Sequence, residues 1–159
     1  NPQFQTQIGE VESKGIEVDI IGNITKNLSI SANYAYTKAV ITEDTDPSKI
    51  DQLNSFSPRE LINSWVSYKF PNHILPGLSL GIGHNSVFKR ATNTVGAFLP
   101  DYTKFDGTIA YSRGKITTRV LLDNITNKRY ILTGDFYDGD AYYTEGAPFN
   151  FKISISVKL

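Results

Sequence analysis

Cysteine and methionine are both absent from this sequence of 159 residues, and histidine occurs only twice. The lack of cysteine excludes disulfides, thiolate catalysis and every metal site built on cysteine. The formal net charge is zero, with 16 Lys and Arg against 16 Asp and Glu. Without a basic block, the sequence argues against nucleic acid as a partner. No stretch approaches the roughly 18 consecutive apolar residues that indicate a transmembrane helix.

Signatures of catalysis are lacking as well. The sequence contains no GxSxG, no HExxH and no phosphate-binding glycine loop. His73 lies in a short expected turn and His84 in an expected strand, and nothing places a carboxylate beside either, which disfavours a hydrolase triad or a histidine metal site. The densest acidic cluster, residues 135–145, departs from the spacing of a calcium loop. We therefore expect no enzymatic activity, no cofactor and no metal site.

The sequence has instead a strong two-residue alternation of apolar and polar side chains, which is the pattern of a strand with one apolar and one polar face. Every second residue from Phe149 to Leu159 is apolar, and the residues between them are Asn, Lys or Ser. We expect an all-β fold, an antiparallel up-and-down meander of about seven strands. Their expected bounds are Gln5–Ile24, Leu28–Ile41, Glu60–Phe70, Leu78–Phe88, Leu99–Tyr111, Lys115–Ile125 and Ala147–Leu159.

The expected connections alternate in length. Three are short turns, at Thr25–Asn27, Pro71–Gly77 and Ser112–Gly114. Three are long polar loops, at Thr42–Arg59, Lys89–Phe98 and Thr126–Gly146. Short turns at one end and long loops at the other are typical of an outer-membrane β-barrel, and so are the aromatic residues near the expected strand ends. Several strands also reach the ~9–11 residues that cross a bilayer, whereas soluble strands usually have ~5–6.

These patterns favour a transmembrane barrel in which one face of the sheet contacts outer-membrane lipid and the other lines the lumen. Ile153 and Ile155 are expected on the lipid face, and Lys152 and Ser154 on the lumen face. Two alternatives stay open: a soluble β-sandwich, in which the apolar face would be a core, and a small outer-membrane barrel. Either would act as a binding module or adhesin through its long loops.

The strand number bears on domain organisation. Single-chain bacterial barrels have an even number of strands, whereas seven are expected here. Together with the absence of methionine, this leads us to expect that residues 1–159 form the C-terminal segment of a larger barrel, with further strands upstream.

The alternation also predicts register, because a slip of one residue would mix the two faces. Between the fifth and sixth strands, Tyr111 is expected opposite Ile116. That register sets Lys104 opposite Asp123, an ion pair on the polar face.

Five segments, in order along the chain, resemble motifs of one family. They are Gly9-Glu-Val-Glu-Ser13-Lys-Gly15-Ile-Glu17 with Gly22-Asn-Ile24, Asn33-Tyr-Ala-Tyr36-Thr-Lys-Ala39, Leu99-Pro-Asp-Tyr102 with Asp106, Asn124-Ile-Thr-Asn-Lys-Arg-Tyr130, and Gly146-Ala-Pro148. Together they resemble the TonB-dependent siderophore receptors of the outer membrane, most closely the ferrichrome-type receptors for ferric hydroxamates.

The resemblance implies a barrel of roughly 22 strands around a plug, of which this chain would form about the last third. It implies a receptor of the bacterial outer membrane that imports ferric siderophores with energy coupled through TonB. The implied partners are the ferric siderophore as transported ligand, TonB acting on a plug that is missing here, membrane lipid, and the barrel-assembly machinery at the last strand. Leu159 stands where family chains usually end in Phe, which weakens the assembly signal.

The loop at Thr126–Gly146 offers the best candidates for ligand contact. Four aromatic residues are interleaved with its acidic residues: Phe136, Tyr137, Tyr142 and Tyr143. Aromatic and polar side chains at a loop tip suit an organic iron chelate, and simple loop packing is the alternative. Trp65 is a further candidate because its parity aims it at the lumen, where it would line the ligand path or pack in the wall.

Overall fold

A computed structural model describes residues 9–55 and 57–159. Residues 5–8, the start of the expected first strand, lie outside these ranges. The elements are β1 (Glu10–Asn23), β2 (Leu28–Glu43), η1 (Pro47–Lys49), β3 (Pro58–Lys69), β4 (Leu78–Ala91), β5 (Phe98–Leu99), β6 (Tyr102–Arg113), β7 (Ile116–Asp123), β8 (Ile131–Tyr137), β9 (Asp140–Glu145) and β10 (Asn150–Val157).

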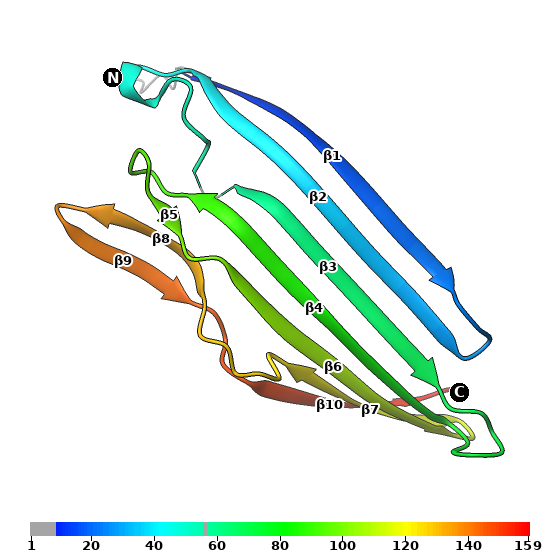
Figure 1. Ribbon diagram of the computed structural model, residues 1–159. Coiled ribbons are helices and arrows are strands. Elements are labelled where there is room, and N and C mark those ends of the chain that lie inside the picture. The colour runs from blue at the N-terminus through cyan, green and yellow to red at the C-terminus, as the bar shows by residue number, and fades with distance from the viewer. Residues whose placement is uncertain (1–8, 56) are drawn as a thin grey trace.

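The main sheet is antiparallel and has eight strands. Seven follow one another in the order β1-β2-β3-β4-β6-β7-β10, which confirms the expected all-β meander, and the short β5 pairs with β4 beside this path (Figure 1). Figure 1 also shows the predicted sorting of the connections. The short turns lie together at one end of the sheet, and the long connections lie at the other, which we call the long-loop end. No helix in the described part of the chain is long and apolar enough to cross a membrane.

Two expectations about strands were wrong. The segment Leu99–Tyr111 is divided into β5 and β6, because Pro100 between them has no backbone N–H with which to continue the ladder. The loop at Thr126–Gly146 is not irregular throughout, since it contains the β8–β9 hairpin, a separate two-stranded sheet. The turn of this hairpin is Asp138-Gly139, and both residues have positive φ, 51° and 86°, as a two-residue hairpin loop requires.

The expected register between the fifth and sixth strands was wrong by two residues. Arg113, rather than Tyr111, pairs with Ile116 across a two-residue turn that begins at Gly114, where φ is 60°. Glycine at the first position suits such a turn because it adopts positive φ without steric cost. Because side chains alternate with a period of two, the slip leaves every residue on its predicted face.

The main sheet is a single layer in the described part of the chain. Ile153 and Ile155 on its apolar face are 62% and 68% exposed, and no second sheet formed by residues 9–55 and 57–159 covers them. A β-sandwich would bury these side chains between two sheets, so this chain does not form the sandwich that the sequence left open. The exposed apolar face is what a barrel wall presents to lipid.

Candidate functional site

A row of polar side chains, which we call the polar belt, crosses the main sheet on one face and has members on every strand except the short β5. Its members are Asp19 on β1, Asn33 on β2, Asn63 on β3, Asn85 on β4, Lys104 and Asp106 on β6, Asp123 on β7 and Asn150 on β10. Most are direct cross-strand partners, because Asp19, Asn33, Asn63, Asn85 and Lys104 pair in succession and Asp123 pairs with Asn150. The face predicted to be polar therefore carries a continuous band of hydrogen-bonding groups.

The first part of the polar belt is a chain of amides. Asn33 Nδ2 donates to Asp19 Oδ1 at 2.8 Å, and Asn85 Nδ2 donates to Asn63 Oδ1 at 2.6 Å. A longer contact of 3.5 Å from Asn63 Nδ2 to Asn33 Oδ1 joins the two pairs. Asn33 and Asn63 each both donate and accept, so the chain of contacts fixes the orientation of their amides.

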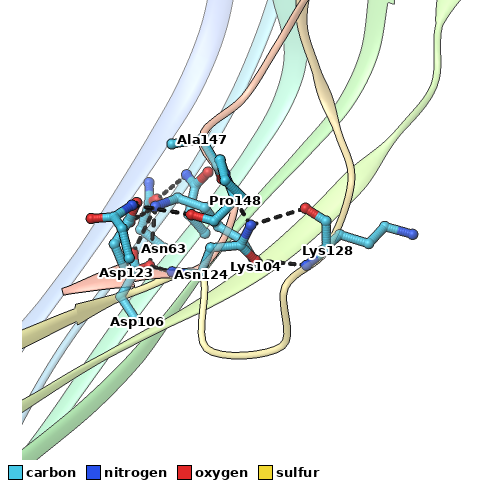
Figure 2. Close-up of polar contacts among 10 residues, drawn as sticks. Asn63, Lys104, Asp106, Asp123, Asn124, Lys128, Ala147 and Pro148 are labelled. Atoms are coloured by element: carbon cyan, nitrogen blue, oxygen red, sulfur yellow. Dashed lines mark hydrogen bonds and ion pairs between the residues drawn. The ribbon is translucent and has the colours of Figure 1, made fainter.

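The second part of the polar belt is charged (Figure 2). Lys104 Nζ lies 2.6 Å from Asp123 Oδ1 and 3.0 Å from Asp106 Oδ2, and the Lys104 side chain is only 18% exposed. Asn150 Nδ2 donates to the other Asp123 oxygen at 3.0 Å. The predicted contact between Lys104 and Asp123 is confirmed, although the corrected register makes it diagonal. One ammonium thus bridges a carboxylate on its own strand, β6, and one on the neighbouring β7.

Asn124, directly after β7, joins the polar belt to the segment that carries the β8–β9 hairpin. It is fully buried and has a φ of 52°. Its Nδ2 donates to the carbonyls of Lys128 at 2.9 Å and Ala147 at 3.0 Å, while its Oδ1 accepts from Lys128 N at 2.8 Å. Its own N–H donates to Asp106 Oδ1 at 2.9 Å (Figure 2). The Asn124 side chain thus connects the segment that leaves β7 toward the hairpin, at Lys128, with the segment that comes back from it, at Ala147.

Arg90, near the end of β4, binds the main chain at the start of the β8–β9 hairpin. The sequence alone did not indicate Arg90 as a functional residue. It is 4% exposed. Its Nη1 donates to the carbonyls of Ile131 and Leu132, both at 2.7 Å, and its Nη2 donates to the carbonyl of Pro100 at 2.9 Å. Its Cζ lies 4.9 Å from the ring centroid of Tyr102, a cation–π contact.

The four aromatic candidates lie on the β8–β9 hairpin, but the structure divides them between its two faces. Tyr137 pairs with Asp140, and Asp135 pairs with Tyr142, which places Tyr137 and Tyr142 on one face. Phe136 and Tyr143 fall on the other. Tyr137 is 76% exposed and Tyr142 is 59% exposed, so this face offers the more accessible aromatic surface.

Trp65 lies away from the hairpin, on β3 within the polar face. A Cβ at Gly81 would stand 2.6 Å from Trp65 Cζ2, and one at Gly83 would stand 2.5 Å from Trp65 Cε3. The indole therefore lies flat over these two glycines of β4. Trp65 is on the predicted face, but the structure does not bring it together with the other candidates.

The long-loop end also contains a groove of about 470 Å³ between residues 41–55 and 91–98. Beside it, the pKa of the Asp46 carboxyl is lowered by hydrogen bonds from the Ser48 hydroxyl and backbone N–H. Desolvation raises the pKa of Asp135, but hydrogen bonds from Phe136 N and from the Asn93 and Thr94 side chains outweigh it and lower that pKa. Among the described residues, no three metal-ligating side chains gather to form a metal site.

Comparison with known families identifies the class of protein to which this geometry belongs. Residues 1–127 match the model of the family described as TonB dependent receptor-like, beta-barrel. The chain belongs to this family, and the resemblance seen in the sequence is confirmed.

The chain is also similar in sequence to individual receptors. The chain is 31% identical over 132 residues to the ferrioxamine B receptor of Salmonella typhimurium, covering 78% of this chain and 18% of the relative. It is 21% identical over 164 residues to the ferrichrome outer membrane transporter/phage receptor of Escherichia coli, covering 93% of this chain and 21% of the relative. The chain thus spans about a fifth of the length of these relatives.

Solved structures share the fold. The ferric yersiniabactin uptake receptor FyuA from Yersinia pestis superposes with a TM-score of 0.82 at 16% sequence identity, covering 94% of this chain and 24% of that structure. This likeness supports the single-layer sheet as part of a barrel wall.

Proposed function

We propose that residues 1–159 form the C-terminal part of the barrel of an outer-membrane receptor that imports ferric siderophores with energy coupled through TonB. The observation that carries this proposal is the family match over residues 1–127, together with the 31% identity to a ferrioxamine B receptor. The exposed apolar face and the polar belt behind it support the proposal, because they provide a lipid-facing and a lumen-facing surface on one sheet.

The proposed partners follow from the same architecture. Membrane lipid contacts the apolar face, the barrel-assembly machinery reads β10, and TonB acts through a plug encoded upstream of this chain. The ferric siderophore is the transported ligand rather than a resident cofactor. The family consists of transport receptors, and we propose that this chain performs no catalysis and binds no nucleic acid.

Ligand contact is proposed for the β8–β9 hairpin, through the aromatic residues identified in the sequence. The hairpin lies beside β5 at the long-loop end of the sheet (Figure 1). Its aromatic side chains are exposed and stand among acidic residues, which is the mixture of apolar and polar groups that suits an organic chelate. Trp65 lies on the polar face of the sheet, which is proposed to face the lumen, and it is proposed to line the ligand path there.

The test is an uptake assay with the full-length receptor, produced in a bacterial strain without its own siderophore receptors. We expect cells to accumulate radioactive iron supplied as ferrioxamine B, ferrichrome or pyoverdine, and to lose this uptake when TonB is inactivated. If an assembled receptor gave no TonB-dependent uptake with any of these chelates, the proposal would be wrong.

A further inference from the structure

Arg90 is a buried cation whose guanidinium donates, among the described residues, to main-chain carbonyls. Its two terminal nitrogens donate to three main-chain carbonyls, and its Nε is buried without a hydrogen-bond partner among the described residues. Keeping a guanidinium in such a place is costly unless its hydrogen bonds have good geometry. The side chain is therefore committed to these carbonyls.

The three carbonyls belong to two segments that are far apart in the sequence. Pro100 lies at the corner between β5 and β6, whereas Ile131 and Leu132 begin β8. Arg90 itself lies one residue before the end of β4, so its guanidinium connects the main sheet, the β5–β6 corner and the base of the hairpin. The planar, branched donor set of arginine makes this possible, while lysine carries a single nitrogen.

A pair of aromatic rings completes the base of the hairpin. The Tyr102 ring, which contacts Arg90, packs against the ring of Tyr130 in a tilted arrangement, with centroids 4.6 Å apart and ring planes at 38°. The Tyr130 ring fills the space that a Cβ would take at Gly146. Tyr130 and Gly146 are also joined by a backbone hydrogen bond of 2.8 Å, at the point where the hairpin begins and ends.

A weaker contact holds the middle of the hairpin. The hydroxyl of Thr94 lies 3.3 Å from Asp135 Oδ1 and 3.4 Å from the Phe136 carbonyl. This contact joins the hairpin to the connection between β4 and β5. Beyond it, the tip at Asp138-Gly139 is exposed, so the hairpin is fixed at its base and free at its tip.

We infer that Arg90 is a positioning residue for ligand capture: by binding the main chain of β8, it seats the β8–β9 hairpin at the long-loop end, where its aromatic face meets the siderophore. The effect on siderophore binding rests on the proposed function, whereas the attachment of the hairpin by Arg90 does not depend on that function. Without Arg90, the hairpin would occupy its binding-competent position for only part of the time. If that part is about a tenth, the apparent Kd rises about tenfold.

The first experiment measures seating alone. In the full-length receptor, Asp138→Cys carries a spin label, with any thiol outside this chain removed, since this chain has no cysteine. Arg90→Lys is expected to increase the mobility of the label. The matched control is Arg129→Lys, because Arg129 is an exposed arginine that forms an ion pair with Glu145 at the surface. Unchanged mobility in Arg90→Lys, with the receptor assembled, overturns the inference.

The second experiment separates positioning from a general loss of structure. Thr94→Cys and Asp135→Cys, whose parent side chains are in contact, form a disulfide that ties the hairpin down without Arg90. In the Arg90→Lys background, binding of iron-loaded ferrioxamine B, ferrichrome or pyoverdine, whichever the unaltered receptor binds, is expected to weaken about tenfold and to recover when this disulfide is oxidised. Continued weak binding with the disulfide formed overturns the positioning role. Absence of binding by the unaltered receptor refutes the proposed function and leaves the label mobility to decide the seating.

Discussion

At the scale of single residues, Asn124 shows how one buried amide can fix a change of chain direction. It follows the last residue of β7, adopts a left-handed φ and satisfies polar groups of Lys128 and Ala147. Asparagine is one of the few residues that adopt this backbone conformation readily and also offer both a donor and an acceptor. The position therefore depends on both properties of the same side chain.

Asn124→Ala is expected to lower the free energy of unfolding of the full-length receptor by about 2–4 kcal/mol, since it leaves buried groups without partners and strains the backbone. Asp51→Ala is the control, because Asp51 also has positive φ but is exposed. Urea unfolding in detergent micelles measures both. Equal losses for the two variants would show that the left-handed backbone, and not the buried amide, sets the cost.

At the scale of elements, the β8–β9 hairpin presents a different chemistry on each face. Tyr137 and Tyr142 share one face with the acidic pair Asp135 and Asp140, while Phe136 shares the other with Tyr143. Tyr143 also borders a hollow near Pro100 and Tyr130 at the base of the hairpin. The face with Tyr137 is the more exposed of the two, although its Asp135 contacts Thr94, and Phe136 on the other face is the least exposed of the four aromatic residues.

The two faces are expected to respond differently to substitution in the full-length receptor. Replacing Tyr137 and Tyr142 together by serine should weaken siderophore binding by at least about tenfold, a loss of about 1.4 kcal/mol. Replacing Phe136 and Tyr143 by serine should instead increase hydrogen exchange of the hairpin amides. Binding to whole cells and exchange measured by mass spectrometry distinguish the two. Equal effects of both pairs on binding would contradict the assignment of faces.

The hairpin also shows what sequence reasoning could and could not reach. The seven main strands were predictable because their alternation has a period of two over long stretches. The hairpin was missed because aromatic residues occupy both of its faces and hide that alternation, although Asp138-Gly139 is a strong hairpin signal. Arg90 and Asn124 could not be predicted from their partners, because most of these are backbone groups, which leave no mark in the sequence.

At the scale of the whole molecule, the polar belt places hydrogen-bonding side chains on neighbouring strands across the main sheet. It runs from β1 to β10, and its charged part lies where β6, β7 and β10 meet. Cross-strand polar pairs contribute little individually, about 0.2–1 kcal/mol each. Lys104 is the exception, since a part-buried ammonium here separates two carboxylates.

Lys104→Met is expected to destabilise the full-length receptor by about 1–3 kcal/mol, because Asp106 and Asp123 then face each other without a cation. Lys14→Met is the control, since Lys14 forms an ion pair with Glu12 at the surface, where its side chain is 75% exposed. Adding Asp123→Asn to Lys104→Met should restore part of the loss. If urea unfolding of the two single variants gave the same midpoint, the charged part of the belt would contribute no more than a surface pair.

The grip of Arg90 on main-chain oxygens has an evolutionary consequence. Carbonyl oxygens are present whatever the side chains are, so the residues of the hairpin can change by mutation without loss of this attachment. Natural selection can therefore alter the ligand that the hairpin recognises while the attachment of its main chain to Arg90 stays constant. The same property suits the hairpin to exchange by protein engineering. A foreign two-stranded segment of equal length, inserted between Leu132 and Glu145, would be held by Arg90 through the same main-chain carbonyls.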